Sequence, residues 1–142
     1  MTDLLVAQAL REQVSGTGGD PPLATLADPE VGRAVALLHD HPERQWSVGA
    51  LAREVSLSRS AFAERFTALT GDAPMRYLRR LRLARAAGLL RDSDLSLAAI
   101  AGHTGYDSEV SLSKAFKRAY GVPPGRYRLR DEEPIVTASV ER

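Results

Sequence analysis

The sequence predicts an all-α protein in which two helix-turn-helix modules are joined by a long linking helix. The linking helix is expected over residues 74–90 (PMRYLRRLRLARAAGLL), because a Pro suits the first turn of a helix and no second Pro follows it. Four apolar side chains recur there at helical spacing: Leu83, Ala86, Ala87 and Leu90. The segments on either side of this helix repeat each other, which predicts a duplicated module rather than a solenoid.

The repeat consists of matched positions at an offset of 50 residues. The aligned pairs are Phe62 with Leu112, Phe66 with Phe116, Gly71 with Gly121, Pro74 with Pro124 and Tyr77 with Tyr127. In each copy, a short helix (residues 48–55, then 97–104) leads through a tight turn to a second helix that Ser58 or Ser108 can cap. These are the parts of a helix-turn-helix motif. Two unrelated helical hairpins are the alternative, but chance does not readily match Phe, Gly, Pro and Tyr.

Before the first module, the sequence predicts a short helix over residues 4–14 and a linker over residues 15–22 (SGTGGDPP). A further helix over residues 29–39 begins after Asp28, which can act as its N-cap, and has a Pro at its first position. Trp46 follows this helix, and we expect it to cover the core of the first module.

After the second module, Pro123 and Pro124 start a last short helix that we expect to reach Tyr127. The end of the chain is acidic, and only residues 135–140 have a weak strand-like pattern. About seven helices are expected in all. The expected parts are residues 1–27, the double module 28–130 and the acidic tail 131–142.

The tight turns of the two copies differ at one position. Gly105 in the second copy suits a positive φ, whereas the first copy has Ser56 at the corresponding place. If Ser56 adopts the same left-handed conformation, its Cβ adds strain of roughly 1 kcal/mol. The sequence therefore predicts a strained residue in the turn of the first module.

The net charge of +1 hides a strong asymmetry along the chain. Residues 44–130 carry 16 Arg or Lys against 7 Asp or Glu, whereas residues 1–43 carry 2 against 7 and residues 131–142 carry 1 against 4. The basic excess lies on the duplicated module, which is typical of a protein that binds a polyanion. A solvated Arg-rich surface without a ligand is the alternative explanation of the charge alone.

Other classes of function find little support in the sequence. The absence of Cys excludes a disulfide framework and a Cys-based zinc site, and nothing resembles a signal peptide or a membrane span. We therefore expect a cytoplasmic protein without a membrane partner. His39 and His41 are interpreted as helix-end residues rather than metal ligands, because the third His, His103, is remote in the sequence. No catalytic Ser/His/Asp pattern stands out, so neither enzymatic activity nor a cofactor is expected.

Residues 100–128 (IAGHTGYDSEVSLSKAFKRAYGVPPGRYR) resemble the C-terminal signature of the DNA-binding domain of AraC/XylS-type bacterial transcriptional regulators. The first module (ALAREVSLSRSAFAERF) and the linking helix, with Arg82-Leu83, Ala86 and Leu89-Leu90, match the same family in the same order. The resemblance covers roughly residues 28–130. It implies a homeodomain-like, all-helical DNA-binding domain.

The resemblance also implies what such a domain would do. It implies a sequence-specific transcriptional regulator that binds double-stranded DNA, with RNA polymerase as a further partner and activation as the usual outcome. Members of the family usually carry a separate effector-binding or dimerisation domain before this one. Residues 4–14 look like the last helix of such a domain, so the chain is either a short regulator or part of a longer one. The effector is not expected to bind to this segment.

The second helix of each module is expected to enter a major groove of DNA. Because the Phe positions define the buried side of these helices, the outward positions follow from helical spacing. The expected base contacts are Arg59, Ser60, Ala63, Glu64, Glu109, Val110, Ser111 and Lys114, of which the resemblance supports all but Arg59 and Glu109. The expected phosphate contacts are Thr67, Arg82, Lys117, Arg118 and Arg126.

The chemistry of these side chains differs between the modules. Lys114 can donate to guanine, and Val110 and Ala63 can meet the methyl group of thymine. Glu64 stands where the family leads us to expect a basic residue. It either accepts a hydrogen bond from cytosine or, as we slightly favour, pairs with a neighbouring Arg. Arg82 either contacts a phosphate or braces the linking helix against a module.

Two modules on one helix allow one chain to bind two grooves. A linking helix of 17 residues is about 25 Å long, and with the module widths it can hold two reading helices roughly 34 Å apart, near one turn of DNA. We therefore expect a monomer on an asymmetric site, with the second module dominating base readout. The alternatives are non-specific DNA coating and a protein-binding modulator of another regulator, for which the weak polarity of residues 59–70 leaves room.

Overall fold

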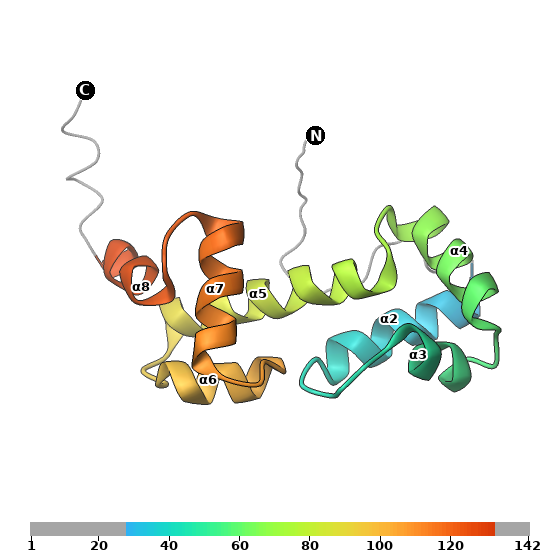
Figure 1. The fold of residues 1–142 in the computed structure, drawn as a ribbon, viewed down its shortest axis with the longest axis horizontal. Helices are drawn as coiled ribbons and strands as arrows, with labels where there is room; N and C mark the ends of the chain where they lie inside the picture. Colours follow the sequence, from blue (N-terminus) through green and yellow to red (C-terminus); the bar gives the residue numbers. More distant parts are fainter. Residues whose placement is uncertain (1–27, 133–142) are drawn as a thin grey trace, which may run out of the picture. The chain divides into compact units, whose positions relative to one another are not determined.

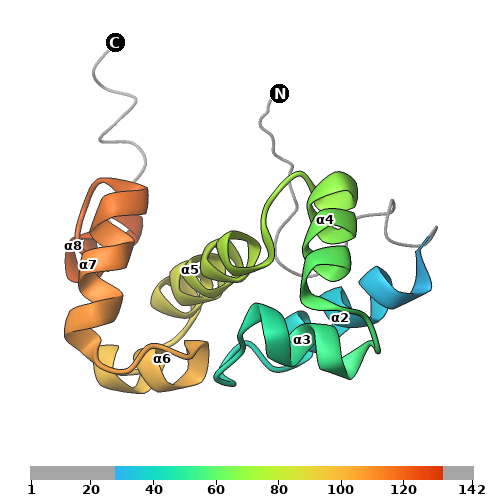
Figure 2. The same cartoon turned by 45° about the vertical axis from the view of Figure 1, so that its right-hand side comes forward.

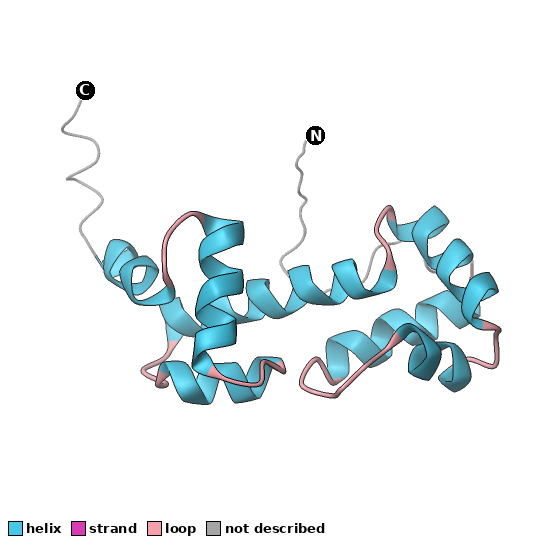
Figure 3. Ribbon diagram, viewed as in Figure 1, coloured by secondary structure: helices cyan, strands magenta, loops and turns pink. Residues whose placement is uncertain are grey.

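The computed structural model describes residues 28–132, which form seven helices and no strand (Figures 1 and 3). The helices are α2 (Pro29–Asp40), α3 (Val48–Glu54), α4 (Arg59–Thr70), α5 (Pro74–Asp92), α6 (Leu97–Thr104), α7 (Glu109–Tyr120) and α8 (Pro124–Glu132). The predicted all-α class is confirmed. Residues 1–27 and 133–142 lie outside the described residues, and with them the helix predicted over 4–14, the linker and the strand-like run 135–140.

The chain divides into two compact units, and the boundary falls inside α5, between Ala84 and Arg85. Each unit contains one of the predicted helix-turn-helix pairs, α3 with α4 in the first unit and α6 with α7 in the second. The order and pairing of these elements confirm the duplication that the sequence indicates.

The first unit is organised around side chains that α2 and α4 bury against each other. Val31, Val35 and Leu38 of α2 have no exposed surface, and neither have Phe62 and Phe66 of α4. The short helix α3 and the start of α5 complete this core. The apolar positions of α2 recur every three or four residues, so burial of one stripe suffices to hold the helix in place.

The predicted position of Trp46 against the core of the first unit is confirmed. It is partly buried there, and its Nε1 donates a hydrogen bond of 2.9 Å to the carbonyl oxygen of His41. The guanidinium of Arg44 lies over the Trp46 ring, 5.7 Å from the centroid. The loop between α2 and α3 is therefore fastened by the single Trp of the sequence.

The second unit repeats the arrangement with its own side chains. Ile100 of α6 and Leu112 and Phe116 of α7 are fully buried, and Ala101 is nearly so. In Figures 1 and 2, α7 crosses α6 and has α8 beside it. A small residue at the crossing lets two helices approach closely, which is the packing expected of a helix-turn-helix.

Several helix boundaries differ from the predicted ones. The helix α2 is one residue longer, α5 two residues longer and α3 one residue shorter than expected. The largest difference is in α8, which was expected to end at Tyr127 and continues to Glu132, so that the expected tail begins in a helix. Arg128 on this helix donates hydrogen bonds to backbone carbonyls at and after the end of α5. Such contacts between distant segments are not visible in the periodicity of the sequence.

The turn between α3 and α4 has the conformation that its counterpart suggested. Ser56 has a φ of 60°, beside 93° for Gly105 in the second unit. The following amide makes the same bond in both turns, from Leu57 to the carbonyl of Ala52 and from Tyr106 to that of Ala101, each at 2.9 Å. These bonds satisfy carbonyls at a helix end, as in a Schellman motif. The predicted strain at Ser56 therefore has a structural basis.

We expect Ser56→Gly to stabilise the first unit by a few tenths to about 1 kcal/mol, because Gly adopts a positive φ without a steric cost. Thermal or urea unfolding followed by Trp46 fluorescence measures the effect. The reverse change, Gly105→Ser, serves as the control; its unfolding is followed by circular dichroism, and it should destabilise the second unit by a similar amount. Destabilisation by Ser56→Gly would show that Ser56 stabilises the turn in some way that its backbone angle does not reveal.

Candidate nucleic-acid interface

The helices α4 and α7 occupy equivalent places in the two units, and both are capped at both ends. Each begins after a serine whose Oγ accepts a backbone hydrogen bond of 3.1 Å, Ser58 for α4 and Ser108 for α7. Each ends at a left-handed Gly, Gly71 with a φ of 86° and Gly121 with a φ of 84°. The caps define where each helix starts and stops, and with that the register of its exposed side chains.

Aromatic side chains anchor the inner side of both helices. In the first unit, Phe66 meets the ring of Tyr77 edge-on, with centroids 5.4 Å apart. In the second unit, Phe116 meets Tyr127 in the same way at 5.2 Å and also stacks on Tyr120, with centroids 4.4 Å apart and an angle of 6°. Aromatic pairs in these geometries add to the stabilisation from burial alone. The buried side of each helix is thus the one that the Phe positions predicted.

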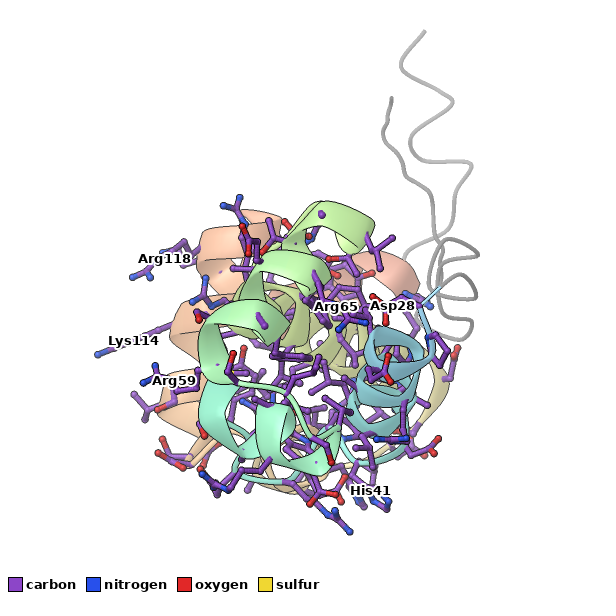
Figure 4. All side chains as sticks on the ribbon, turned by 90° about the vertical axis from the view of Figure 1, so that its right-hand side faces the viewer. Asp28, His41, Arg59, Arg65, Lys114 and Arg118 are labelled. Carbon is purple, nitrogen blue, oxygen red and sulfur yellow. The ribbon has the colours of Figure 1, made fainter. Side chains whose placement is uncertain are left out.

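The outward residues predicted from helical spacing are exposed, with the exception of Ala63, which is half-buried. The exposed ones are Arg59, Ser60, Glu64 and Thr67 on α4 and Glu109, Val110, Ser111, Lys114, Lys117 and Arg118 on α7. Arg126 is exposed on α8. Figure 4 shows the side chains of Lys114 and Arg118 extending away from their helix. Val110 is 59% exposed, so most of this branched apolar side chain lies at the surface of α7.

The two exposed faces differ in charge. The face of α4 has one charge of each sign, on Arg59 and Glu64, whereas α7 presents three cations with one acid. Glu64 and Lys114 stand at equivalent positions of the repeat. The ion pair of Glu64 with a neighbouring Arg, which the sequence slightly favoured, is absent among the described residues. The reason is local: the positions three and four residues away hold Ser, Ala and Thr, and none of these is a cation.

Arg82 has the bracing role that was its alternative interpretation. Its Nε donates to the carbonyl of Pro42 at 2.9 Å and its Nη2 to that of Arg44 at 2.8 Å. Arg128 does the same in the second unit, where its guanidinium donates to the carbonyls of Leu90, Ser93 and Leu95 at 2.9 to 3.1 Å. In the first unit, an Arg on α5 thus binds the loop after α2. In the second unit, an Arg on α8 binds the end of α5 and the loop that follows it. Two nitrogens of the Arg82 guanidinium are thus engaged by backbone carbonyls of its own unit, which favours a structural role over a phosphate contact.

Arg65 is a residue of the interface region that the sequence analysis missed. It lies on α4 beside Glu64, and its guanidinium holds the carboxylate of Asp28 with two hydrogen bonds, Nε to Oδ2 at 2.9 Å and Nη2 to Oδ1 at 2.7 Å. Nη2 also donates to Oε1 of Glu30 at 3.0 Å. Figure 4 shows Arg65 and Asp28 facing each other. The hydrogen bonds from Arg65 hold the pKa of the Asp28 carboxyl below its usual range, so the pair is ionised at neutral pH.

A second connection in the first unit joins α5 to α2. The hydroxyl of Tyr77 lies 2.8 Å from Nε2 of His39. Burial raises the pKa of Tyr77 to about 12, which keeps this hydroxyl protonated at neutral pH. In the second unit, Nη1 of Arg91 donates to the hydroxyl of the equivalent Tyr127 at 3.2 Å. In each unit, the Tyr that packs against the buried Phe of α4 or α7 therefore also makes a polar contact through its hydroxyl.

Within residues 28–132, no helix combines the length and the apolar character needed to cross a membrane. The same residues contain no group of three or more His, Cys, Asp or Glu side chains arranged to hold a metal ion. His41 lies beside Glu43 instead, with 3.6 Å between Nδ1 and Oε2.

Two capped helix-turn-helix units, each with an anchored inner side and an exposed polar outer side, define a helix-turn-helix protein of the double-module class. A family model described as a helix-turn-helix domain matches residues 51–130. An AraC-like transcription regulator of Streptomyces lividans is 48% identical over 112 residues, which are 79% of this chain and 37% of that protein. The chain belongs to the AraC-type family of helix-turn-helix regulators, which is a class of DNA-binding regulators rather than of enzymes.

Two further similarities are informative. The regulator AlkR of Acinetobacter baylyi is 36% identical over 130 residues, which are 90% of this chain and 42% of that protein. The chain therefore spans about two fifths of the length of the curated relatives it matches. The crystal structure of the DNA-binding domain of the global transcriptional factor AdpA, in complex with a target DNA, is similar with a TM-score of 0.69 and 37% identity. That likeness covers 71% of this chain and 91% of the AdpA chain.

Proposed function

We propose that this chain is the DNA-binding part of a transcriptional regulator that recognises a specific double-stranded sequence, with α4 and α7 each entering a major groove. The observation that carries the proposal is the pair of capped helices with exposed outer sides, since a major groove admits one α-helix. The AdpA domain, which is similar over most of its length, was crystallised with its target DNA. Membership of the AraC-type family supports the same function.

The proposed contacts follow from the exposed side chains. Bases are read by the outward residues of the two helices, namely Arg59, Ser60, Ala63, Glu64, Glu109, Val110, Ser111 and Lys114. Phosphates are bound by Thr67, Lys117, Arg118 and Arg126, together with backbone amides at helix starts. The two modules engage successive major grooves from a single chain. The double module 28–130 is the functional unit in this proposal.

The regulator as a whole is proposed to activate transcription in the cytoplasm, with RNA polymerase as its partner, because activation is the usual outcome in the family that the chain resembles. Its effector is proposed to bind outside this segment. The chain spans about two fifths of the length of the relatives AlkR and the Streptomyces lividans regulator.

The chemistry of the two recognition helices points to different bases. On α7, Val110 can contact the methyl group of a thymine and Lys114 can donate to O6 or N7 of a guanine. Side chains four residues apart on a helix lie about 6 Å from each other, close to two base steps of about 3.4 Å. The site of α7 should therefore contain a thymine and a guanine within about two base pairs. On α4, Glu64 is free to accept a hydrogen bond from the amino group of a cytosine.

Selection of bound duplexes from a random pool tests the proposed function. We expect a motif in two parts about one helical turn apart, which is the spacing of successive major grooves on one side of DNA. The motif should be asymmetric, because the faces of α4 and α7 differ chemically. Enrichment of no motif, with equal retention of all sequences, would leave only non-specific DNA coating. A chain that retains no DNA at all would favour the protein-binding alternative, which the nearly neutral face of α4 allows.

Lys114→Ala and Lys117→Ala form a matched pair for the enriched motif. Lys114→Ala should weaken binding by about 1–3 kcal/mol and relax the preference at one or two base pairs, because this side chain is proposed to read a base. Lys117→Ala should weaken all sequences alike, because it is proposed to contact phosphate. Fluorescence anisotropy with matched and single-mismatch duplexes measures both effects. Equal losses on matched and mismatched duplexes for Lys114→Ala would contradict its role in base readout.

A further inference from the structure

We infer that Arg65 is a positioning residue for DNA recognition, which sets the rotation of α4 through the carboxylates of Asp28 and Glu30. The inference rests on the proposed function and adds a residue that touches no base itself. Arg65 stands on the recognition helix, but its guanidinium points to the start of α2 and is occupied there. Its role is therefore to hold the helix that carries the reading side chains.

The geometry of the contact fixes orientation as well as distance. Both oxygens of Asp28 accept from the planar guanidinium, so the pair has the two-pronged form that restricts rotation of the partners. Asp28 is itself fixed, because its Oδ1 caps α2 through the amide of Val31 at 3.2 Å. Glu30 accepts a third hydrogen bond. The Asp28 side chain is 13% exposed and that of Arg65 40%, so the contact is partly shielded from water.

Such a contact supplements what the buried rings provide. Phe62 and Phe66 bury one side of α4 in the core. Contacts on one side restrain the distance of a helix from the core more than its rotation, or roll, about its own axis. Side-chain tips on a helix lie about 6 Å from the axis, so a roll of about 20° moves them by about 2 Å. A hydrogen bond to a base edge does not survive such a shift, because its donor and acceptor must stay within about 3.2 Å. The lateral contact of Arg65 opposes this roll.

The second unit shows what replaces this device. The position equivalent to Arg65 is Ala115, which has no charge to pair. There Tyr120 at the end of α7 meets the ring of Tyr127 on α8 edge-on, with centroids 5.6 Å apart, whereas the first unit has Thr70 in place of Tyr120. The two recognition helices are thus held in position by different means, α4 by an ion cluster with the start of α2 and α7 by an edge-on aromatic contact with α8. Loss of Arg65 should affect only one half of the DNA site.

The test compares the discrimination of the full chain between the enriched motif and duplexes with one changed base pair in either half. The half read by α4 is identified as the one in which Glu64→Ala loses preference. Arg65→Ala should reduce the discrimination ratio in that half by roughly fivefold or more, within the range that one base contact provides, and leave the other half unchanged. Arg65→Lys keeps the positive charge that Arg65→Ala removes. It should retain only part of the discrimination ratio, because Lys lacks the planar guanidinium that binds both oxygens of Asp28.

Two further variants make the test specific. Arg80→Ala is the matched control, because Arg80 also pairs with a carboxylate, Asp72, at 2.7 Å but stands on α5. It should leave both ratios unchanged. Asp28→Asn keeps an oxygen that can cap α2 and removes the charge that Arg65 holds, so it should lower the ratio in the α4 half as Arg65→Ala does. It also answers the case in which Arg65→Ala fails to fold, which Trp46 fluorescence would reveal.

The possible outcomes separate the explanations. A loss confined to the α4 half, in Arg65→Ala and Asp28→Asn alike, supports the inference. An equal loss of affinity on all duplexes, with a salt slope reduced by about one, would mean that Arg65 contacts phosphate and would overturn it. Unchanged ratios in both variants would also overturn it while leaving the proposed function intact. Failure of the unmodified chain to enrich any motif would remove the proposed function and this inference together.

Discussion

Replacing Phe66 or Phe116 with Ala should cost about 3–5 kcal/mol of unfolding free energy, the largest single-residue effect that we expect in this protein. Both rings are fully buried, and each meets a Tyr ring edge-on at 5.4 or 5.2 Å. Truncation would remove the transfer energy of the ring and leave a cavity that capped helices cannot easily close. Because small domains are stable by only about 5–15 kcal/mol, a loss of this size would unfold a large fraction of the affected unit.

Urea or thermal unfolding followed by circular dichroism measures this loss, and Trp46 fluorescence reports the first unit separately. Leu129→Ala is the control, since Leu129 is 62% exposed and its truncation should change stability by less than about 0.5 kcal/mol. A loss below about 1 kcal/mol for either Phe variant would mean that the ring does not anchor its recognition helix. The outward positions would then have to be assigned again.

DNA binding should depend steeply on salt. If about six phosphates are neutralised, log K should fall with log salt at a slope of roughly −5, which is about a thousandfold between 50 and 200 mM salt. The reason is the release of condensed counterions by the basic excess of residues 44–130, where 16 Arg or Lys stand against 7 Asp or Glu. The slope is measured by anisotropy titrations of one duplex at several salt concentrations.

The structure restricts which cations contribute to this slope. Arg65 is paired with two carboxylates, and Arg76 and Arg80 share Asp72. The exposed cations proposed to meet DNA are Arg59, Lys114, Lys117, Arg118 and Arg126. Lys117→Ala should therefore reduce the slope by about one. A slope near zero for the unmodified chain would contradict binding to a polyanion, whatever the origin of the basic excess.

Much of the candidate site could be predicted because its determinants are local. Phe62 and Phe66 recur at helical spacing, so the outward side of α4 follows from the sequence, and nearly all of its predicted residues are exposed. Ser58 and Ser108 are caps whose partners lie three residues away. The left-handed Ser56 was inferred by comparing two copies of one turn. In each case the interacting groups are close in the chain or repeated at a fixed offset.

The parts that could not be predicted depend on pairs of distant residues. Arg65 and Asp28 are 37 positions apart, and the basic character of a segment does not tell which guanidinium is already paired. Arg82 and Arg128 hold carbonyls 33 to 40 residues away, and backbone acceptors carry no signature in the sequence. The expected pair of Glu64 with an Arg is absent among the described residues for a local reason. The positions three and four residues away hold no cation, and the adjacent Arg65 is paired with Asp28 and Glu30.

The sequence by itself determined the all-α class, the duplication, the capped recognition helices and the residues they expose, since helical periodicity and capping act over three or four positions. Only the tertiary structure decided how the arginines are divided between fold and surface, and how each recognition helix is held in place. The physical reason is that a guanidinium has five donors and can bind a carboxylate, a backbone carbonyl or a phosphate. Which of these it meets is settled by the packing of α2 against α4 and of α8 against the end of α5.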